Sequence, residues 1–386
     1  KTVTLLAIIA VSISVSVVIL SFGILLGFKK EIREKVKGYA GDINVTRYQL
    51  ASGNETNLFD IDSAFITKTK NDPAIESIYP FIHKAGILKS DSTLEGIIFK
   101  GVPANFNFYF YQKHLVWGKI PIYSDTSDSY DILISEYTAT ILDLDTGDRV
   151  DLYFIDQADV RRRKPKICGV FNTGLREFDK QFAIADLRSI QRIVDQTYTQ
   201  AGGYQINIKD ANSTPEIQDQ LSKLLDYTYA IQTMQDLYPN MFQWLDIVDT
   251  NVLVIIILMS IVAIINIITM LLILIIERIP MIGILKSMGA SSSKIGSIFN
   301  WQGGFILFGG LLLGNIIALG LAHLQKKYTI IQLNPDTYYM DAVPFHLPYD
   351  YLVYINLIAL LVCFIFTYIP IRLIHRIQPV QSIQFS

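Results

Sequence analysis

Residues 271–302 read LLILIIERIPMIGILKSMGASSSKIGSIFNWQ. An apolar run ends abruptly at Glu277 and Arg278, a short amphipathic segment follows, and a second apolar run begins near Gly303 after a cluster of serines. This order predicts a membrane helix that leaves the bilayer, a small helix that lies outside it, and a helix that returns into it. Such an arrangement suits a protein that receives a mechanical input at the membrane surface.

The composition also indicates a membrane protein. Of the 386 residues, 51% are hydrophobic and only 18% are charged. A run of roughly 20 apolar residues is needed to cross the hydrocarbon core of a bilayer. Four runs reach or approach this length: Val3–Phe28, Val252–Ile276, Gly303–Ala322 and Tyr351–Ile371. The first run is too long for a signal peptide and no small-residue cleavage site follows it, so we interpret it as a permanent span.

The segment between the first two runs has the composition of a globular domain. Two helices are expected there, at Leu187–Thr197 and Pro215–Leu225. Strands are expected at Asp42–Tyr48, Ala85–Leu88, Gly96–Gly101, Asp131–Ile134, Arg149–Ile155, Lys166–Phe171, Gln181–Ala185 and Tyr204–Ile208. The predicted fold is therefore a membrane protein with four transmembrane helices and a large α+β domain between helices 1 and 2.

Charged residues next to the runs predict the orientation of the chain. The segment 277–302 and the tail after residue 371 together hold more basic residues than the loop 323–350, which places the first two in the cytoplasm. We expect transmembrane helices at residues 1–28, 248–276, 303–322 and 351–371, the large domain at 29–247, a cytoplasmic segment at 277–302, an outer loop at 323–350 and a cytoplasmic tail at 372–386.

The sequence contains no pattern typical of an enzyme or a metal site. It lacks the glycine-rich loop with which many proteins hold the phosphates of ATP. The five histidines are scattered, and Cys168 and Cys363 have no spacing that indicates a metal site or a disulfide framework. The run Asp143–Asp148 lacks the closing glutamate of a calcium loop. A net charge of −2 gives no reason to expect a nucleic-acid partner.

The segment after Arg278 predicts a short amphipathic helix. Pro280 suits its first turn, and Gly289 can end it in a left-handed conformation. Apolar residues recur at i, i+3, i+4 and i+7: Met281, Ile284, Leu285 and Met288. Two interpretations fit this stripe. The helix either lies on the membrane surface or fits a groove on a partner protein.

The third run predicts a smooth strip of small residues on one helix face. This strip consists of Gly303, Gly310, Gly314 and Ala318. Small residues at this spacing allow helix backbones to approach closely in a membrane. The strip suits packing within one chain or between two chains, and the sequence does not decide between them.

A basic cluster at Arg161–Lys164 lies between two strand-like runs of the domain. It is either the solvated tip of a hairpin or a protrusion that binds an acidic partner.

Residues 277–299, ERIPMIGILKSMGASSSKIGSIF, resemble the coupling region of MacB/FtsX-type ABC transporter permeases. In that region a Glu-Arg start, an Ile-Gly pair and a Leu-Lys-x-Met/Leu-Gly-Ala ending recur. Within this superfamily, four pieces are similar to the LolC/LolE permeases of lipoprotein-releasing systems. They are Phe-x-x-Gln-Gly at 299–303 with the spaced glycines that follow it, LNPDTYYMDAVPFHL at 333–347, GVFNTGLREFD at 169–179 and IQPVQSIQ at 377–384.

The resemblance implies a complex in the bacterial inner membrane. Two permease subunits, identical or related, would bind two copies of a separate ATPase, which carries ATP and Mg, while this chain binds no cofactor. The complex would extract lipoproteins from the outer leaflet and pass them to a periplasmic chaperone. The residues expected to contact the ATPase are Glu277, Arg278, Met281, Ile282, Gly283, Ile284, Leu285, Lys286, Met288 and Gly289.

The resemblance also implies contacts on the outer side. The family's chaperone-binding hairpin corresponds roughly to Phe154–Lys166, which here includes Val160, Arg161, Arg162, Arg163 and Pro165. Lipid is expected between spans 1 and 2, where the candidate contacts are Phe22, Phe28, Val252 and Ile256.

Three other interpretations stay open. The chain could be a MacB-type efflux permease, or an FtsX-like signalling protein that activates a periplasmic hydrolase, although the outer domain of FtsX is usually much smaller. The third interpretation is a membrane-bound enzyme, and the only argument against it is that the sequence contains no recognisable catalytic motif. Whether the permease pairs with itself or with a second permease also stays open.

Overall fold

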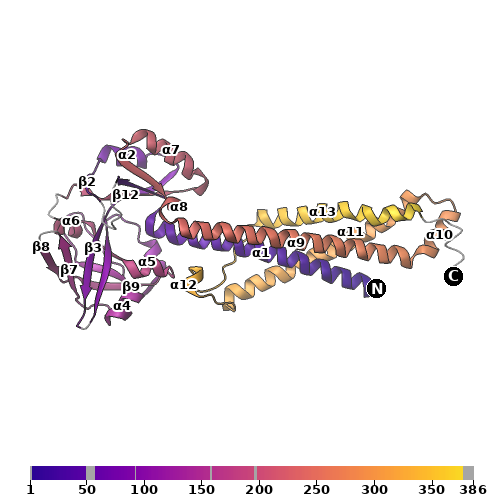
Figure 1. Cartoon of the computed structure of the whole chain (residues 1–386), viewed down its shortest axis with the longest axis horizontal. Coiled ribbons are helices and arrows are strands. Elements are labelled where there is room, and N and C mark those ends of the chain that lie inside the picture. The colour runs from indigo at the N-terminus through magenta and orange to yellow at the C-terminus, as the bar shows by residue number, and fades with distance from the viewer. Residues whose placement is uncertain (1, 49–56, 92, 157–158, 195–197, 377–386) are drawn as a thin grey trace. The chain divides into compact units, whose positions relative to one another are not determined.

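A computed structural model describes residues 2–48, 57–91, 93–156, 159–194 and 198–376 of the chain (Figure 1). The chain divides into two compact units. The helical unit comprises Lys1–Lys30, Trp244–Gln332 and Ala342–Ser386, and the sheet unit comprises Glu31–Gln243 and Leu333–Asp341.

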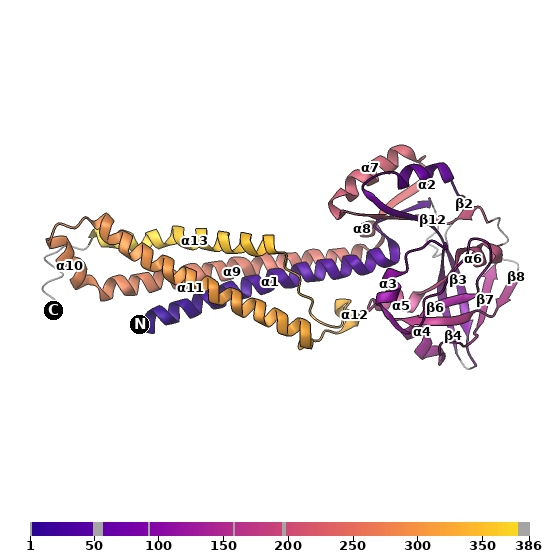
Figure 2. The ribbon, with the colours of Figure 1, turned by 180° about the vertical axis from the view of Figure 1, so that it is seen from behind.

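Four long helices lie side by side in the helical unit (Figures 1 and 2). They are α1 (Thr2–Ala40), α9 (Pro239–Glu277), α11 (Ser292–Tyr328) and α13 (Tyr349–Arg376), and the short α10 (Ile279–Ser287) connects α9 to α11. Among the described residues, these four are the helices long and apolar enough to cross a membrane. The prediction of four transmembrane helices is therefore confirmed.

The helices extend beyond the predicted spans. α1 continues past Phe28 to Ala40 through a charged stretch, because Lys, Glu and Arg are good helix formers. α9 begins at Pro239, well before residue 248. No break separates the segment 277–302 from the span 303–322, since α11 runs continuously from Ser292. Hydropathy marks the part of a helix that matches lipid, whereas the helix itself ends at its caps, so the membrane boundaries stay predictions.

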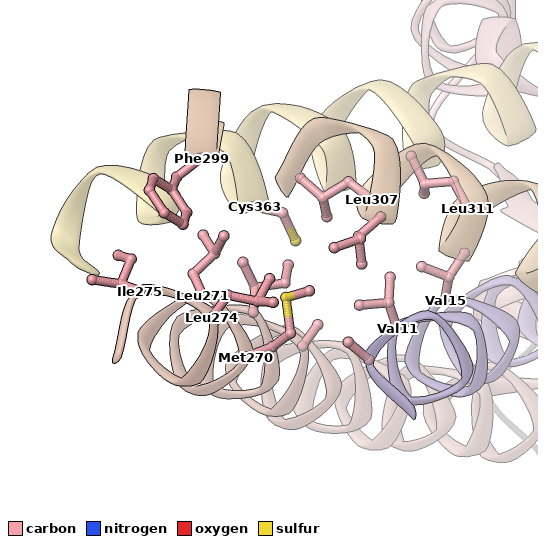
Figure 3. Close-up of a cluster of buried hydrophobic side chains, with 14 of the residues drawn as sticks. Val11, Val15, Met270, Leu271, Leu274, Ile275, Phe299, Leu307, Leu311 and Cys363 are labelled. Atoms are coloured by element: carbon pink, nitrogen blue, oxygen red, sulfur yellow. The ribbon is translucent and has the colours of Figure 1, made fainter. Parts of the chain in front are cut away.

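The core of the helical unit is formed by side chains from all four helices (Figure 3). Val11 and Val15 come from α1, and Cys363 comes from α13. The other labelled residues are Met270, Leu271, Leu274 and Ile275 from α9, and Phe299, Leu307 and Leu311 from α11. Because lipid tails are as apolar as these side chains, close van der Waals packing has to hold the helices together.

Two glycines of α11 lie directly against α1. A Cβ atom at Gly310 would come within 2.6 Å of Val11, and one at Gly314 within 2.9 Å of the backbone oxygen of Ser12. The Ser16 hydroxyl donates a hydrogen bond to the Gly314 carbonyl at 2.9 Å. In this structure the small-residue strip thus packs within one chain.

α11 also contacts α13 through polar groups. The side-chain amides of Asn315 and Asn356 donate to each other's oxygens at 2.7 and 3.0 Å. Nearer the start of α11, the Thr367 hydroxyl donates to Asn300 at 2.7 Å. Such interhelical hydrogen bonds fix the register of two helices in a membrane.

The described residues of the sheet unit form an eleven-stranded mixed sheet. The strand order is β13-β1-β12-β3-β4-β10-β6-β9-β5, with β7 paired to β3 and β8 paired to β7. The strands are β1 (Ile43–Arg47), β3 (Ile75–Lys89), β4 (Leu94–Val102), β5 (Leu115–Gly118), β6 (Asp131–Ser135), β7 (Asp151–Asp156), β8 (Asp159–Arg163), β9 (Lys166–Phe171), β10 (Phe182–Asp186), β12 (Gly203–Ile208) and β13 (Tyr229–Thr233). A two-stranded sheet pairs β2 (Phe59–Asp60) with β11 (Gln200–Ala201).

The sheet unit also contains short helices, which completes the predicted α+β class. They are α2 (Ser63–Lys70), α3 (Tyr109–Lys113), α4 (Glu136–Leu142), α5 (Arg176–Gln181), α6 (Leu187–Ile193), α7 (Thr214–Leu224), α8 (Met234–Leu237) and α12 (Pro335–Tyr338), with the 3-10 helix η1 (Ala211–Ser213). α6 ends before Thr197, and residues 195–197 of that predicted helix lie outside the described residues.

Replacing Gly314 with leucine is expected to destabilise the purified chain by about 1–3 kcal/mol, because a larger side chain overpacks the contact with α1. Gly320 in the same helix has no atom within 4 Å of the place that a Cβ would take, so Gly320→Leu is the matched control. Thermal unfolding in detergent measures both. Equal unfolding temperatures for the two variants would contradict the role of this contact.

Candidate functional sites

The first candidate site is α10 with its flanking residues. Gly289 follows the helix with φ of +89°. Its N–H donates to the Lys286 carbonyl and that of Ala290 donates to the Leu285 carbonyl, both at 3.0 Å. This pair of bonds is the Schellman motif, which glycine favours because it adopts positive φ without a Cβ clash. The structure thus ends α10 where the sequence predicts.

One face of α10 is exposed, and we call it the α10 face. It consists of Met281, Ile284 and Met288, whose exposed fractions are 38%, 55% and 79%. Leu285 of the predicted stripe is instead half-buried against the core of the helical unit. Ile282 is fully buried in that core, and Gly283 is buried too, so neither is available to a partner. Glu277, Arg278 and Gly289 are exposed, and Lys286 is half-buried.

The second candidate site is an apolar groove of about 310 Å³ in the helical unit. α1, α9 and α13 line it, and Phe22 and Ile256 are among its residues. Phe28 and Val252 do not line it. Phe28 is buried against Trp244, with ring centroids 5.5 Å apart, and Val252 is 7% exposed.

Residues of α13 complete this groove, and none of them was among the lipid contacts predicted from the sequence. Tyr354, Ile358 and Cys363 are examples. The sequence shows that the fourth run, Tyr351–Ile371, is apolar, but it does not show which helices lie next to that run. A groove with this lining accepts an apolar chain and offers few hydrogen-bond partners.

The third candidate site is the β7–β8 hairpin at the edge of the sheet. Arg162 of β8 makes a bidentate bond to Asp151 of β7, at 3.0 and 2.7 Å, and this hydrogen bonding lowers the pKa of Asp151. Arg161 donates to the Ile193 carbonyl. Val160 and Arg162 are exposed, Arg161 and Arg163 are half-buried, and Pro165 is buried. Residues 157–158 of the predicted hook lie outside the described residues.

The part of the chain that the structure describes contains no group of three or more His, Cys, Asp or Glu residues able to hold a metal ion. Cys168 and Cys363 are free and buried.

Two family models match the chain. The MacB-like periplasmic core domain matches residues 4–224, more than half of the chain, and the FtsX-like permease C-terminal model matches residues 253–379. The chain belongs to the MacB/FtsX permease superfamily. The first match covers α1 and most of the sheet unit, and the second covers the remaining membrane helices with α10.

Within the MacB/FtsX superfamily, the chain resembles lipoprotein-releasing proteins over its full length. It is 21% identical to the transmembrane protein LolC of Xylella fastidiosa (strain Temecula1), over 100% of this chain and 94% of that protein. It is 22% identical to LolC of Neisseria meningitidis serogroup B, with the same coverage. It is also 22% identical to LolE of Haemophilus influenzae, over 97% of this chain and 92% of that protein. The predicted LolC/LolE resemblance is thus confirmed, and the family is that of a transporter permease rather than a catalytic subunit.

Cysteine labelling is expected to distinguish the two faces of α10. In a background without the two native cysteines, Met288→Cys should react readily with a water-soluble maleimide, whereas Ile282→Cys should stay protected because its side chain is buried. The reagent should reach position 288 only from the cytoplasmic side of sealed vesicles. Labelling from the opposite side would overturn the predicted orientation.

Proposed function

We propose that the chain is the permease subunit of an ABC transporter that extracts lipoproteins from the outer leaflet of the bacterial inner membrane. The lipoproteins pass to a periplasmic chaperone. Full-length similarity to proteins named LolC and LolE is the observation that supports this most strongly. ATP and Mg are held by a separate ATPase present in two copies, and this chain binds no cofactor. The second permease of the complex is either the same chain or a related one.

The apolar groove fits the anchor of such a cargo. Burial of acyl chains stabilises membrane anchoring by about 0.8 kcal/mol per CH₂, so three chains represent on the order of 30 kcal/mol. Spontaneous release of a lipoprotein into water is therefore negligible. Extraction needs an input of energy and a protein surface that keeps the acyl chains away from water. A groove of α1, α9 and α13 residues, Phe22 and Ile256 among them, gives an acyl chain a protein surface to contact as it leaves the bilayer.

The α10 face supplies the contact with the ATPase. Its two methionines are flexible and polarisable, which suits a groove that changes shape during a cycle. The buried Ile282 holds α10 to the helical core. A push on the α10 face is therefore passed to this core, which includes Ile295 and Phe299 of α11.

The β7–β8 hairpin supplies the contact with the chaperone. Val160 and Arg162 are exposed on its edge strand, and the guanidinium of Arg162 is held in place by Asp151. Arginine is one of the residue types enriched in binding hot spots, and Asp151 keeps this one in a fixed position.

A MacB-type efflux permease is the alternative function. The match to the MacB-like periplasmic core over residues 4–224 favours it. An FtsX-like signalling role is less well supported, because the domain between the first two spans is large.

Introducing a charge into the α10 face should prevent binding of the ATPase. Met288→Asp is expected to lower co-purification of the ATPase at least about fivefold, the effect of a cost above 1 kcal/mol at an apolar contact. Ser287→Asp adds the same charge on the neighbouring exposed residue and should have little effect. Equal recovery of the ATPase with both variants would contradict docking at Met288.

Photo-crosslinking should identify the cargo and its groove. A photoreactive residue at Phe22 or Ile256 is expected to capture acylated lipoprotein in membranes, while one at Ile316, exposed on α11, captures bulk lipid only. Mass spectrometry identifies the captured molecules. Capture of a peptide or drug-like molecule in place of lipoprotein would favour the efflux alternative.

A further inference from the structure

Lys35 occupies an unusual position for a lysine. It lies in the part of α1 that belongs to the sheet unit, and only 5% of its surface is exposed. Its ammonium donates a hydrogen bond to the carbonyl of Tyr339 at 3.2 Å. The carboxylates of Glu31, Asp341 and Asp179 act on it electrostatically. A charge withdrawn from water in this way has to be paired, so its partners are constrained as well.

Asp179, the last residue of the motif GVFNTGLREFD, is one of these partners, and it closes the turn that begins at Thr173. Asp179 accepts hydrogen bonds from the Thr173 N–H at 3.1 Å and from the Thr173 hydroxyl at 2.8 Å. Burial raises the pKa of Asp179 to about 6. Gly174 has φ of +71°, and a Cβ there would come within 2.8 Å of the Lys35 ammonium. The turn is therefore shaped to leave room for that group.

Two further partners, the Tyr339 carbonyl and Asp341, belong to the connection between α11 and α13. The Leu333 N–H donates to the Asp341 carbonyl at 2.8 Å, which closes residues 333–341 into a compact loop. Within it, the Tyr339 N–H donates to Pro335 at 3.0 Å, and Tyr339 has φ of +60°. A bulky residue in the left-handed region is strained, and such strain persists only where the surroundings impose it.

The helical unit contains a second contact between α1 and the same connection. A Cβ at Gly27 would come within 2.7 Å of the Pro344 carbonyl, and one at Gly23 within 2.1 Å of the Phe345 ring. The His346 N–H donates to the Gly23 carbonyl at 3.0 Å. The connection thus follows α1 closely at these glycines, and Lys35 holds it again further along the helix.

We propose that Lys35 is a positioning residue that fastens the α11–α13 connection to α1 and to the Thr173–Asp179 turn, so that movement of α11 reaches the sheet unit through this contact. The inference rests on the proposed function, in which the ATPase moves α10 and α11. Lys35 contacts neither the ATPase nor the cargo. It acts by keeping three segments, distant in sequence, in one rigid contact.

The test uses the full complex with its ATPase and the variant Lys35→Met, which keeps the aliphatic stem and removes the charge. Hydrogen exchange of residues 169–179 is compared with and without ATP. In the parent complex ATP should change this exchange, and in Lys35→Met the change should disappear while ATP hydrolysis continues. Lipoprotein release should fall about tenfold, within the usual range of couplings between sites. Lys35→Arg, which keeps the charge, should restore part of both.

Lys113→Met is the matched control, because Lys113 is an exposed lysine near Lys35 and its loss should leave both readouts unchanged. If Lys35→Met fails to fold, Asp341→Asn removes an exposed carboxylate near the ammonium and should weaken the ATP-driven change in the same direction. An undiminished change in Lys35→Met, or in Asp341→Asn where that variant replaces it, overturns the inference. Failure of the parent complex to release lipoprotein overturns the proposed function instead, since the exchange readout does not depend on the cargo.

Discussion

The close contact between α1 and α11 is the interaction on which the helical unit depends. In lipid no hydrophobic force draws apolar helices together, so their association requires surfaces that touch over many atoms. Gly310 and Gly314 provide this, because the absence of a side chain allows the α1 backbone near Ser12 to approach. The Ser16 hydroxyl lies within hydrogen-bond distance of the Ser12 carbonyl in its own helix, at 2.7 Å, and of the Gly314 carbonyl across the contact, at 2.9 Å, so it adds a polar interaction between the two helices.

The far end of α1 is attached to the sheet by buried polar groups. The Lys100 ammonium of β4 donates to the Tyr39 carbonyl in the last turn of α1, and to Gln205 of β12 at 2.6 Å. Burial lowers the pKa of Lys100 to about 7. Asp42, just after α1, accepts the Ile208 N–H at 2.7 Å and lies 3.1 Å from the Lys37 ammonium. Breaking these buried bonds would leave polar groups without a partner, because water does not reach them. The end of α1 and the sheet therefore move together.

The features that could be predicted from the sequence are those that depend on residues close together along the chain. The spans follow from the length of the apolar runs, and the end of α10 follows from Gly289. Two strands show the limit of local patterns. β3 begins at Ile75 rather than Ala85, and Pro80 within it is a residue that normally argues against a strand. The basic cluster was predicted as a hairpin tip or a protrusion, whereas Arg161–Arg163 belong to strand β8, where Arg162 pairs across the hairpin with Asp151.

The residues that the sequence missed owe their roles to distant partners. The small-residue strip was visible, but only the folded chain shows that α1 packs against it. The contribution of α13 to the groove has the same origin. Lys35 is the clearest case, because a lysine after an apolar run is expected at a membrane surface with its ammonium in water. Its burial depends on Gly174 and Tyr339, two residues with positive φ in segments far from α1. The positive φ of Tyr339 is strained, and the positive φ of Gly174 can be adopted without strain only by glycine. Such conformations persist only where the surroundings impose them, and here the contact of both segments with Lys35 does so.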